Sequence, residues 1–235
     1  MKSKIIIAFS LACFFLSVLL TPAAAAVFDI LITGGAVYDG SRHAPRAADI
    51  GVIGDKIAAV GDLSKADAKK VVDACNLIVT PGFIDVHNHT DMFFDKAGNR
   101  RYMAMLIPAW KGNYNYITQG VTTVVTGLCG QGYADTDRWL GLVRLIKYGA
   151  NVYHLMPYGV LRTKLFGKDQ PRGLTSGQLE SLKQGVEREM QKGALGVSVG
   201  LEYAPDCFTT TDELVEIAKI VNKYGGVYVA HIRDN

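Results

Sequence analysis

Short apolar segments alternate with amphipathic helical segments over residues 83–231, and this alternation limits the fold more than any other feature of the chain. Thr175 and Thr210 each begin a capping-box pattern that predicts a helix start, and Gly193 and Gly225 predict the ends of the two helices. Such an order of elements predicts an α/β fold with a parallel sheet and right-handed crossovers. The predicted strands, which are rich in apolar residues and mostly bounded by glycine, are 83–86, 120–127, 151–156, 194–200 and 226–231.

Side chains that can bind a metal follow three of these strands, at or just past the strand's C-terminal end. His87 and His89 follow the first strand, Cys129 the second and His231 the fifth. Five strand–helix units fit either an open sheet or a barrel, but the active sites of (β/α)8 barrels occupy this face. A nucleotide-binding open sheet needs a glycine-rich loop after its first strand, where this chain has the histidine pair. The sequence therefore predicts the N-terminal part of a (β/α)8 TIM-type barrel, preceded by a small β-rich segment.

Residues 27–80 are predicted to form a small β-sandwich segment. The first strand is predicted to end at the Gly34-Gly35 break, and residues 49–61 have the pattern of a hairpin. The Pro81-Gly82 pair is the predicted domain boundary, because proline and glycine interrupt regular structure. Residues 81–235 then form the partial barrel, with strands one to five.

The first 26 residues have the pattern of a secretory signal peptide. Lys2 and Lys4 give a basic start, residues 5–20 are apolar, and residues 22–26 are small and rich in alanine. This pattern predicts a signal peptide over 1–26 and an exported protein, periplasmic or secreted, with no stable membrane anchor after cleavage. An uncleaved membrane anchor is the alternative.

Three cysteines follow the predicted signal peptide: Cys75, Cys129 and Cys207. An odd number in an oxidising compartment leaves at least one thiol unpaired or engaged in other work. A disulfide between Cys75 and Cys207 is neither excluded nor favoured by the sequence. Cys129 is the cysteine whose neighbouring residues indicate a chemical role.

His87 and His89 lie two residues apart at the end of the first predicted barrel strand. Side chains alternate along a strand, so both imidazoles are expected on one face while Asn88 points away. Two imidazoles side by side can bind one divalent cation, and imidazole suits zinc, copper, iron or nickel. The alternative is a polar strand end without a metal, with Cys129 as a buried small residue and His231 as an ordinary polar group.

Four segments of the chain occur in the order found in one known family: Pro81 to His89, Gln119 to Gly130, Gly193 to Pro205, and His231 to Asp234. Together they resemble the metal-dependent amidohydrolase superfamily and, within it, the D-aminoacylase (N-acyl-D-amino-acid deacylase) branch. The resemblance runs from about Phe28 to the last residue. It departs from the family between Asp91 and Gln119, where this chain is longer. Residues 92–116 are predicted to form either a lid or entrance loop, or an ordinary surface helix.

The resemblance implies a zinc site built from residues that follow the strands. His87 and His89 would hold the more exposed metal position. Cys129 would stand where many members use a bridging carboxylated lysine, and His231 would be the ligand on the fifth strand. Sulfur and imidazole ligands together suit zinc.

The implied reaction is zinc-dependent hydrolysis of a linear amide bond, which deacylates small-molecule N-acyl-D-amino acids as part of a longer parent enzyme. Glu202 and Tyr203, just past the fourth strand, are candidates for the substrate pocket, with a polar loop start as the alternative. The catalytic residues are unknown, because the family's general-base aspartate and a further histidine ligand are expected beyond Asn235.

The absence of those residues leads to two expectations for the chain as given. It is predicted to be truncated after the fifth strand, and to be inactive without the missing residues. Another amidohydrolase activity, such as cyclic-imide or dipeptide hydrolysis, and a truncated non-catalytic product are the alternatives. A formal net charge of +3 is too small to predict a nucleic-acid partner.

Overall fold

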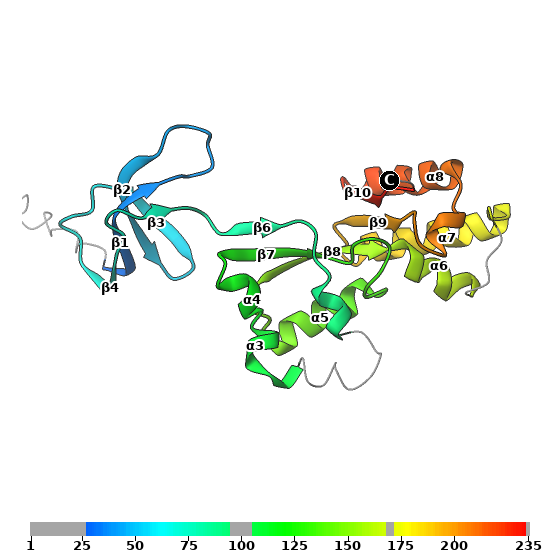
Figure 1. The fold of residues 1–235 in the computed structure, drawn as a ribbon, viewed down its shortest axis with the longest axis horizontal. Helices are drawn as coiled ribbons and strands as arrows, with labels where there is room; N and C mark the ends of the chain where they lie inside the picture. The colour runs from blue at the N-terminus through cyan, green and yellow to red at the C-terminus, as the bar shows by residue number, and fades with distance from the viewer. Residues whose placement is uncertain (1–26, 95–104, 168–171, 234–235) are drawn as a thin grey trace, which may run out of the picture. The chain divides into compact units, whose positions relative to one another are not determined.

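The computed structural model describes residues 27–94, 105–167 and 172–233, and the chain divides into two compact units between Pro81 and Gly82. Each unit builds a sheet of its own (Figure 1). The predicted signal peptide lies outside the described residues, so export stays a prediction. Within the described ranges, no helix has the length and apolar character that a membrane span requires.

The first unit is a mixed five-stranded sheet centred on β1 (Phe28–Val37). β2 (Arg46–Ile53) pairs with β1 in the antiparallel sense, and β4 (Ala68–Asp73) and β5 (Ile78–Val79) pair with it in parallel. β3 (Lys56–Gly61) returns along β2, which confirms the predicted hairpin. The described part of this unit forms one sheet, so the second layer of the predicted sandwich is not within it and the sandwich stays a prediction.

The predicted strand break at Gly34-Gly35 is wrong, because β1 continues through both glycines. The register between β1 and β2 shifts between Ile32 and Gly35, which marks a bulge. Gly34 has a φ of 72°, a left-handed value that glycine adopts without steric cost. The glycines therefore bend the strand and do not end it.

The second unit is a curled parallel sheet in the order β10-β9-β8-β7-β6, covered by helices (Figure 1). Strands that are consecutive in the chain are therefore neighbours in the sheet. The predicted α/β alternation is confirmed, and the half-barrel curl fits the predicted fold class. The strands are β6 (Phe83–Asp85), β7 (Val121–Thr126), β8 (Asn151–Pro157), β9 (Gly196–Gly200) and β10 (Val227–His231).

Helices α7 (Ser176–Gln191) and α8 (Thr211–Lys223) begin at the predicted positions. Thr175 and Thr210 are their N-caps, and both capping boxes are complete. The apolar stripes of the two helices pack against α6 (Tyr158–Phe166) and the sheet. The buried members of this core are Met156, Tyr158, Leu161, Leu182, Val186, Met190, Ala194, Val197, Val199, Ile217 and Val221.

A second, aromatic core of the second unit lies against β8. Trp139 on α5 (Thr136–Ile146) is fully buried, and its ring centroid lies 5.5 Å from that of Phe94 and 5.4 Å from that of Tyr133. Phe94 belongs to η1 (Thr90–Phe94), the 3-10 helix that comes directly after the histidine pair. This core therefore anchors the segment that leaves β6.

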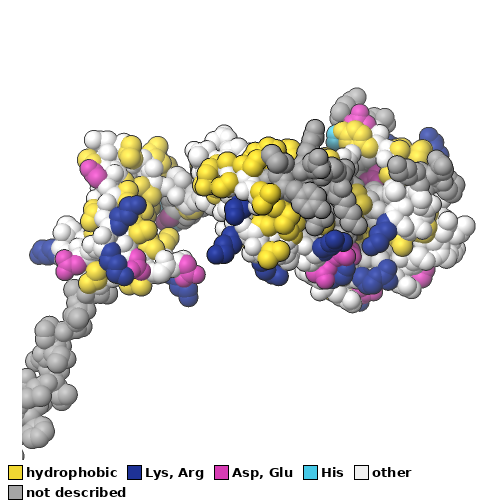
Figure 2. Space-filling model, turned by 90° about the horizontal axis from the view of Figure 1, so that it is seen from below, with side chains coloured by type: hydrophobic (Ala, Val, Ile, Leu, Met, Phe, Trp, Pro, Cys, Tyr) yellow, Lys and Arg dark blue, Asp and Glu magenta, His cyan; other side chains and the backbone are white. Residues whose placement is uncertain are grey.

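Residues 92–116, predicted to form either a lid or entrance loop or a surface helix, do not form one surface helix in their described part. Residues 95–104 lie outside the described residues, and two one-turn helices, α3 (Pro108–Lys111) and α4 (Tyr114–Ile117), lie between them and β7. Neither short helix has a buried residue, and hydrophobic side chains gather on the surface at this end of the unit (Figure 2). The lid stays a prediction.

Candidate metal centre

The two histidines lie just past β6, on a turn held by side-chain hydrogen bonds. The Asp85 carboxylate accepts from the His87 backbone N–H at 3.1 Å and from the Asn88 side-chain amide at 3.2 Å. The side-chain oxygen Oδ1 of Asn88 then accepts from the Thr90 N–H at 2.8 Å, and Asn88 is buried. The rings of His87 and His89 have centroids 5.3 Å apart. The two rings are close together as expected, but a turn and not a strand places them.

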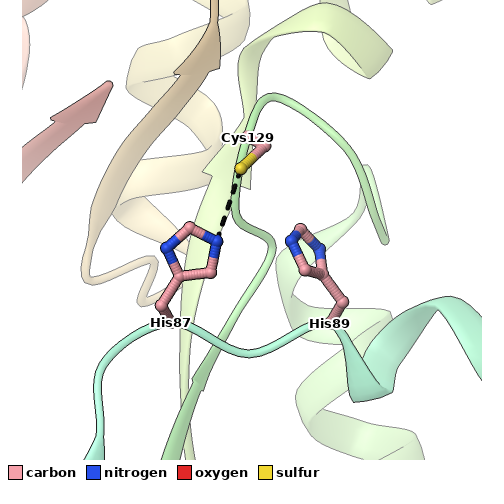
Figure 3. Close-up of side chains that lie close together, drawn as sticks. All are labelled: His87, His89 and Cys129. Carbon is pink, nitrogen blue, oxygen red and sulfur yellow. Dashed lines mark hydrogen bonds between the residues drawn. The ribbon is translucent and has the colours of Figure 1, made fainter. Parts of the chain in front are cut away.

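Cys129 approaches the histidines from the loop after β7. Its Sγ lies 3.5 Å from His87 Nε2. One ligand atom each from His87, His89 and Cys129 lie within 4.8 Å of one another, and the three side chains point toward a common space (Figure 3). Cys129 has a φ of 54°, a left-handed value that costs a non-glycine residue about 1–2 kcal/mol. The loop is therefore held in this shape by its surroundings.

The spacing of these donors fits a zinc ion. Zn–S and Zn–N bonds of about 2.3 and 2.0 Å at a tetrahedral angle put sulfur and nitrogen about 3.5 Å apart. The distance between Cys129 Sγ and His87 Nε2 has this value. In addition, the buried Nδ1 of His89 has no hydrogen-bond partner within the described residues. A buried nitrogen without a partner is costly, so the described residues leave one side of the His89 ring unsatisfied.

The electrostatic surroundings act differently on the two kinds of donor. Burial, and secondarily the neighbouring His87, lower the pKa of His89, so its imidazole is neutral near pH 7 and has a lone pair to donate. Burial raises the pKa of the Cys129 thiol. A bound metal would supply the positive charge that favours the thiolate.

His231 does not join the three-donor cluster. It ends β10, and its Nε2 lies 2.7 Å from Glu202 Oε2, while its ring packs edge-on against Tyr203 with centroids 4.9 Å apart. The carboxylate just after β9 therefore holds this imidazole. Nδ1 of His231 lies outside that pair, and its role as a ligand stays a prediction.

A cavity of about 230 Å³ adjoins Cys129. Tyr203 lines this cavity and Glu202 does not, so the two predicted substrate-binding residues have different surroundings. Asp206, another lining residue, is almost fully buried, and burial raises the pKa of its carboxyl to about 7. Asp206 was not among the predicted residues, because a single aspartate in a loop carries no local signal.

No family model matches the chain, but individual proteins do. A D-aminoacylase from Alcaligenes xylosoxydans xylosoxydans is 34% identical over 230 residues, which cover 88% of this chain and 45% of that protein. An N-acyl-D-glutamate deacylase from the same organism is 31% identical, with coverages of 88% and 44%. A solved D-aminoacylase structure matches with a TM-score of 0.75 and 32% identity, and covers 88% of this chain and 46% of its own. The chain is a homologue of the D-aminoacylases.

Two further solved structures resemble this D-aminoacylase homologue. The N-acyl-D-glutamate deacylase of Bordetella bronchiseptica, complexed with zinc and a phosphonate inhibitor, has a TM-score of 0.76 and 28% identity, and the match covers 89% of this chain and 46% of that one. An L-hydantoinase from Arthrobacter aurescens, with a TM-score of 0.58 and 20% identity, shares the fold alone. The D-aminoacylase homologue spans a little under half the length of the curated relatives described above.

Proposed function

We propose that the protein to which this chain belongs is a zinc-dependent hydrolase that removes the acyl group from N-acyl-D-amino acids. The observation that carries the proposal is the convergence of His87, His89 and Cys129 in a homologue of the D-aminoacylases. The zinc in the deacylase structure from Bordetella bronchiseptica supports the choice of metal. The proposal includes a closed (β/α)8 barrel, of which the curled sheet would be the first five strands.

His87, His89 and Cys129 would hold the zinc. A bound zinc would polarise the scissile carbonyl and lower the pKa of its bound water toward about 7. His89 donates the lone pair that its lowered pKa leaves free at neutral pH. Cys129 supplies a thiolate, whose negative charge binds the metal more strongly than a neutral donor does.

Of the two predicted pocket residues, Tyr203 is the one placed to meet the substrate, because it lines the cavity that adjoins Cys129. Its phenol O–H can donate a hydrogen bond to a carbonyl or carboxylate oxygen of an N-acyl amino acid. Glu202 acts on His231 and not on the cavity, so we assign it to holding that imidazole. His231 then remains available to complete the metal site with its other ring nitrogen.

The alternatives have less support. Cyclic-imide hydrolysis is supported only by a likeness in fold to a hydantoinase. A non-catalytic role for the 235-residue chain stays open, because the donor cluster found in the described residues contains no carboxylate that could serve as general base. General acid–base catalysis typically contributes about 10²–10⁴-fold to the rate of a reaction. Metal binding is therefore a more direct test of this site than turnover is.

Zinc bound per chain, measured by equilibrium dialysis and elemental analysis, tests the site. The wild-type chain is expected to hold zinc, and Cys129→Ser is expected to lose most of it because a hydroxyl is a much poorer donor than a thiolate. Cys207→Ser is the matched control, since Cys207 is a partly buried free thiol of the same unit that lies outside the cluster.

The outcome that contradicts the proposed site is a full zinc content in Cys129→Ser with an unchanged thermal melt. The substrate class needs a separate measurement on the whole protein. Acetate release from N-acetyl-D-methionine is expected to exceed release from the L enantiomer. Equal rates, or a preference for the L form, would contradict the proposed substrate.

A further inference from the structure

Two buried carboxylates lie against the cysteine loop, which we define as residues 127–132. Asp91 and Asp206 are both buried, and they come from segments that lie far apart in the sequence. Each occupies the space over a glycine of the loop. A Cβ atom added at Gly132 would overlap Asp91 Oδ2, and one added at Gly130 would overlap Asp206 Oδ2. An acidic side chain therefore packs directly against each of these two glycines.

Asp91 ties the cysteine loop to the histidine turn. It lies two residues after His89, in η1, and its Oδ2 accepts from the Tyr133 backbone N–H at 3.0 Å. Tyr133 comes directly after the loop and stacks on the buried ring of Trp139. This hydrogen bond joins the two segments whose ligand atoms converge, so it fixes their separation.

Asp206 ties the same loop to the ends of β8 and β9. Its Oδ2 accepts from the Gly200 N–H at 2.8 Å, at the last residue of β9. A Cβ at Gly159, just after β8, would overlap Asp206 Oδ1. A Cβ at Gly200 would in turn overlap the carbonyl oxygen of Cys129. Cys129 is therefore packed against the strand end that Asp206 holds.

We propose that Asp91 and Asp206 are positioning residues that clamp the cysteine loop from two sides and set the distance from Cys129 Sγ to the two histidines. The inference rests on the proposed function, because it assigns a role toward the metal. Neither carboxylate belongs to the donor cluster in the described residues. Their effect on the metal passes through the loop, as is typical of groups that orient ligands.

Cobalt binding tests the clamp, because a cysteine ligand gives a sulfur-to-cobalt charge-transfer band that reports on Cys129 itself. Asp91→Ala and Asp206→Ala are each expected to weaken Co²⁺ and Zn²⁺ binding by about 10–100-fold and to reduce the band at saturating metal. Asp91→Asn and Asp206→Asn retain a carbonyl oxygen as acceptor and are expected to bind nearly as the wild type does. Asp212→Ala is the control, since Asp212 is exposed on α8.

A thermal melt of each metal-free variant separates positioning from simple stability. Alanine variants that melt earlier but keep the wild-type metal affinity and band would overturn the inference while leaving the proposed metal site intact. If the wild-type chain shows no cobalt–thiolate band, the proposed metal site is wrong, and the inference that rests on it is wrong as well. If an alanine variant does not fold, Asp91→Ser or Asp206→Ser takes its place, with the same direction expected and wild-type binding again overturning the clamp.

Discussion

Acid is expected to destabilise the second unit through one buried imidazole, that of His154. His154 lies on β8 almost completely out of contact with solvent, and its two ring nitrogens lie 2.9 Å from Thr126 Oγ1 and 2.9 Å from the Tyr133 carbonyl oxygen. Burial lowers its pKa from 6.5 to about 4, although the Tyr133 carbonyl and Glu189 act in the opposite direction. The folded protein therefore keeps this imidazole neutral where the unfolded chain protonates it.

The sign and size of the effect are set by that difference in pKa. The pKa of His154 is lower in the folded protein than in the unfolded chain. The contribution of His154 to the free energy of unfolding is therefore complete above pH 6.5 and is lost as the pH falls toward 4. A difference of roughly 2.5 pKa units corresponds to about 3 kcal/mol in full. Between pH 8 and pH 5 the His154 contribution falls by about 2 kcal/mol. Asp206, whose pKa of about 7 makes it gain a proton over the same range, acts in the opposite direction, but it does so equally in the wild type and in a His154 variant.

Urea unfolding followed by tryptophan fluorescence, with a chelator present, measures this loss. Trp110 and Trp139 are the two tryptophans of the chain and both belong to the second unit, so the signal reports on that unit. The wild type is expected to lose about 2 kcal/mol more than His154→Gln between pH 8 and pH 5. His43→Gln, which removes an exposed imidazole of the first unit, is the control. Equal losses in the wild type and His154→Gln would refute the reasoning.

Two further changes test the helices of the second unit. Thr175→Ala removes the N-cap of α7 and is expected to lower the free energy of unfolding by about 1 kcal/mol, whereas Ser176→Ala at the next, exposed position is expected to change it little; equal effects would contradict the cap. Arg162→Leu leaves the buried Glu213 carboxylate without its ion-pair partner at 3.0 Å, and a loss of about 3–5 kcal/mol is expected in the same urea assay. A loss below about 1 kcal/mol would show that Glu213 is satisfied by its other contacts.

Features with a local signal in the sequence could be predicted. The capping boxes at Thr175 and Thr210 mark their helices because the interacting residues lie three positions apart. The approach of Cys129 to the histidine pair could be expected as well, since parallel strands bring their C-terminal ends to one edge. The position of the histidines on a turn could not be expected, because it depends on how the Asp85 and Asn88 side chains bond to the backbone.

Long-range contacts have no comparable signal in the amino-acid sequence. Asp91 meets Tyr133 across 42 positions, and His154 meets Thr126 across 28, so neither pairing can be inferred from spacing. The same holds for Gly34-Gly35, where pairing with strands on both sides keeps β1 continuous through residues that usually interrupt a strand. His231 was expected among the ligands, and its partner in the structure is the carboxylate at the end of the neighbouring strand.

The packing of Asp91 over Gly132 also restricts the order in which this sequence can change during evolution. A side chain at position 132 has no room while the aspartate is present, and the φ of 123° at Gly132 adds a backbone penalty for any other residue. An enlargement at 132 is therefore expected to displace the Asp91 carboxylate from the Tyr133 N–H unless residue 91 is shortened first or together with it. In related sequences the two positions are expected to vary as a pair, and an exchange of one alone is expected to be rare.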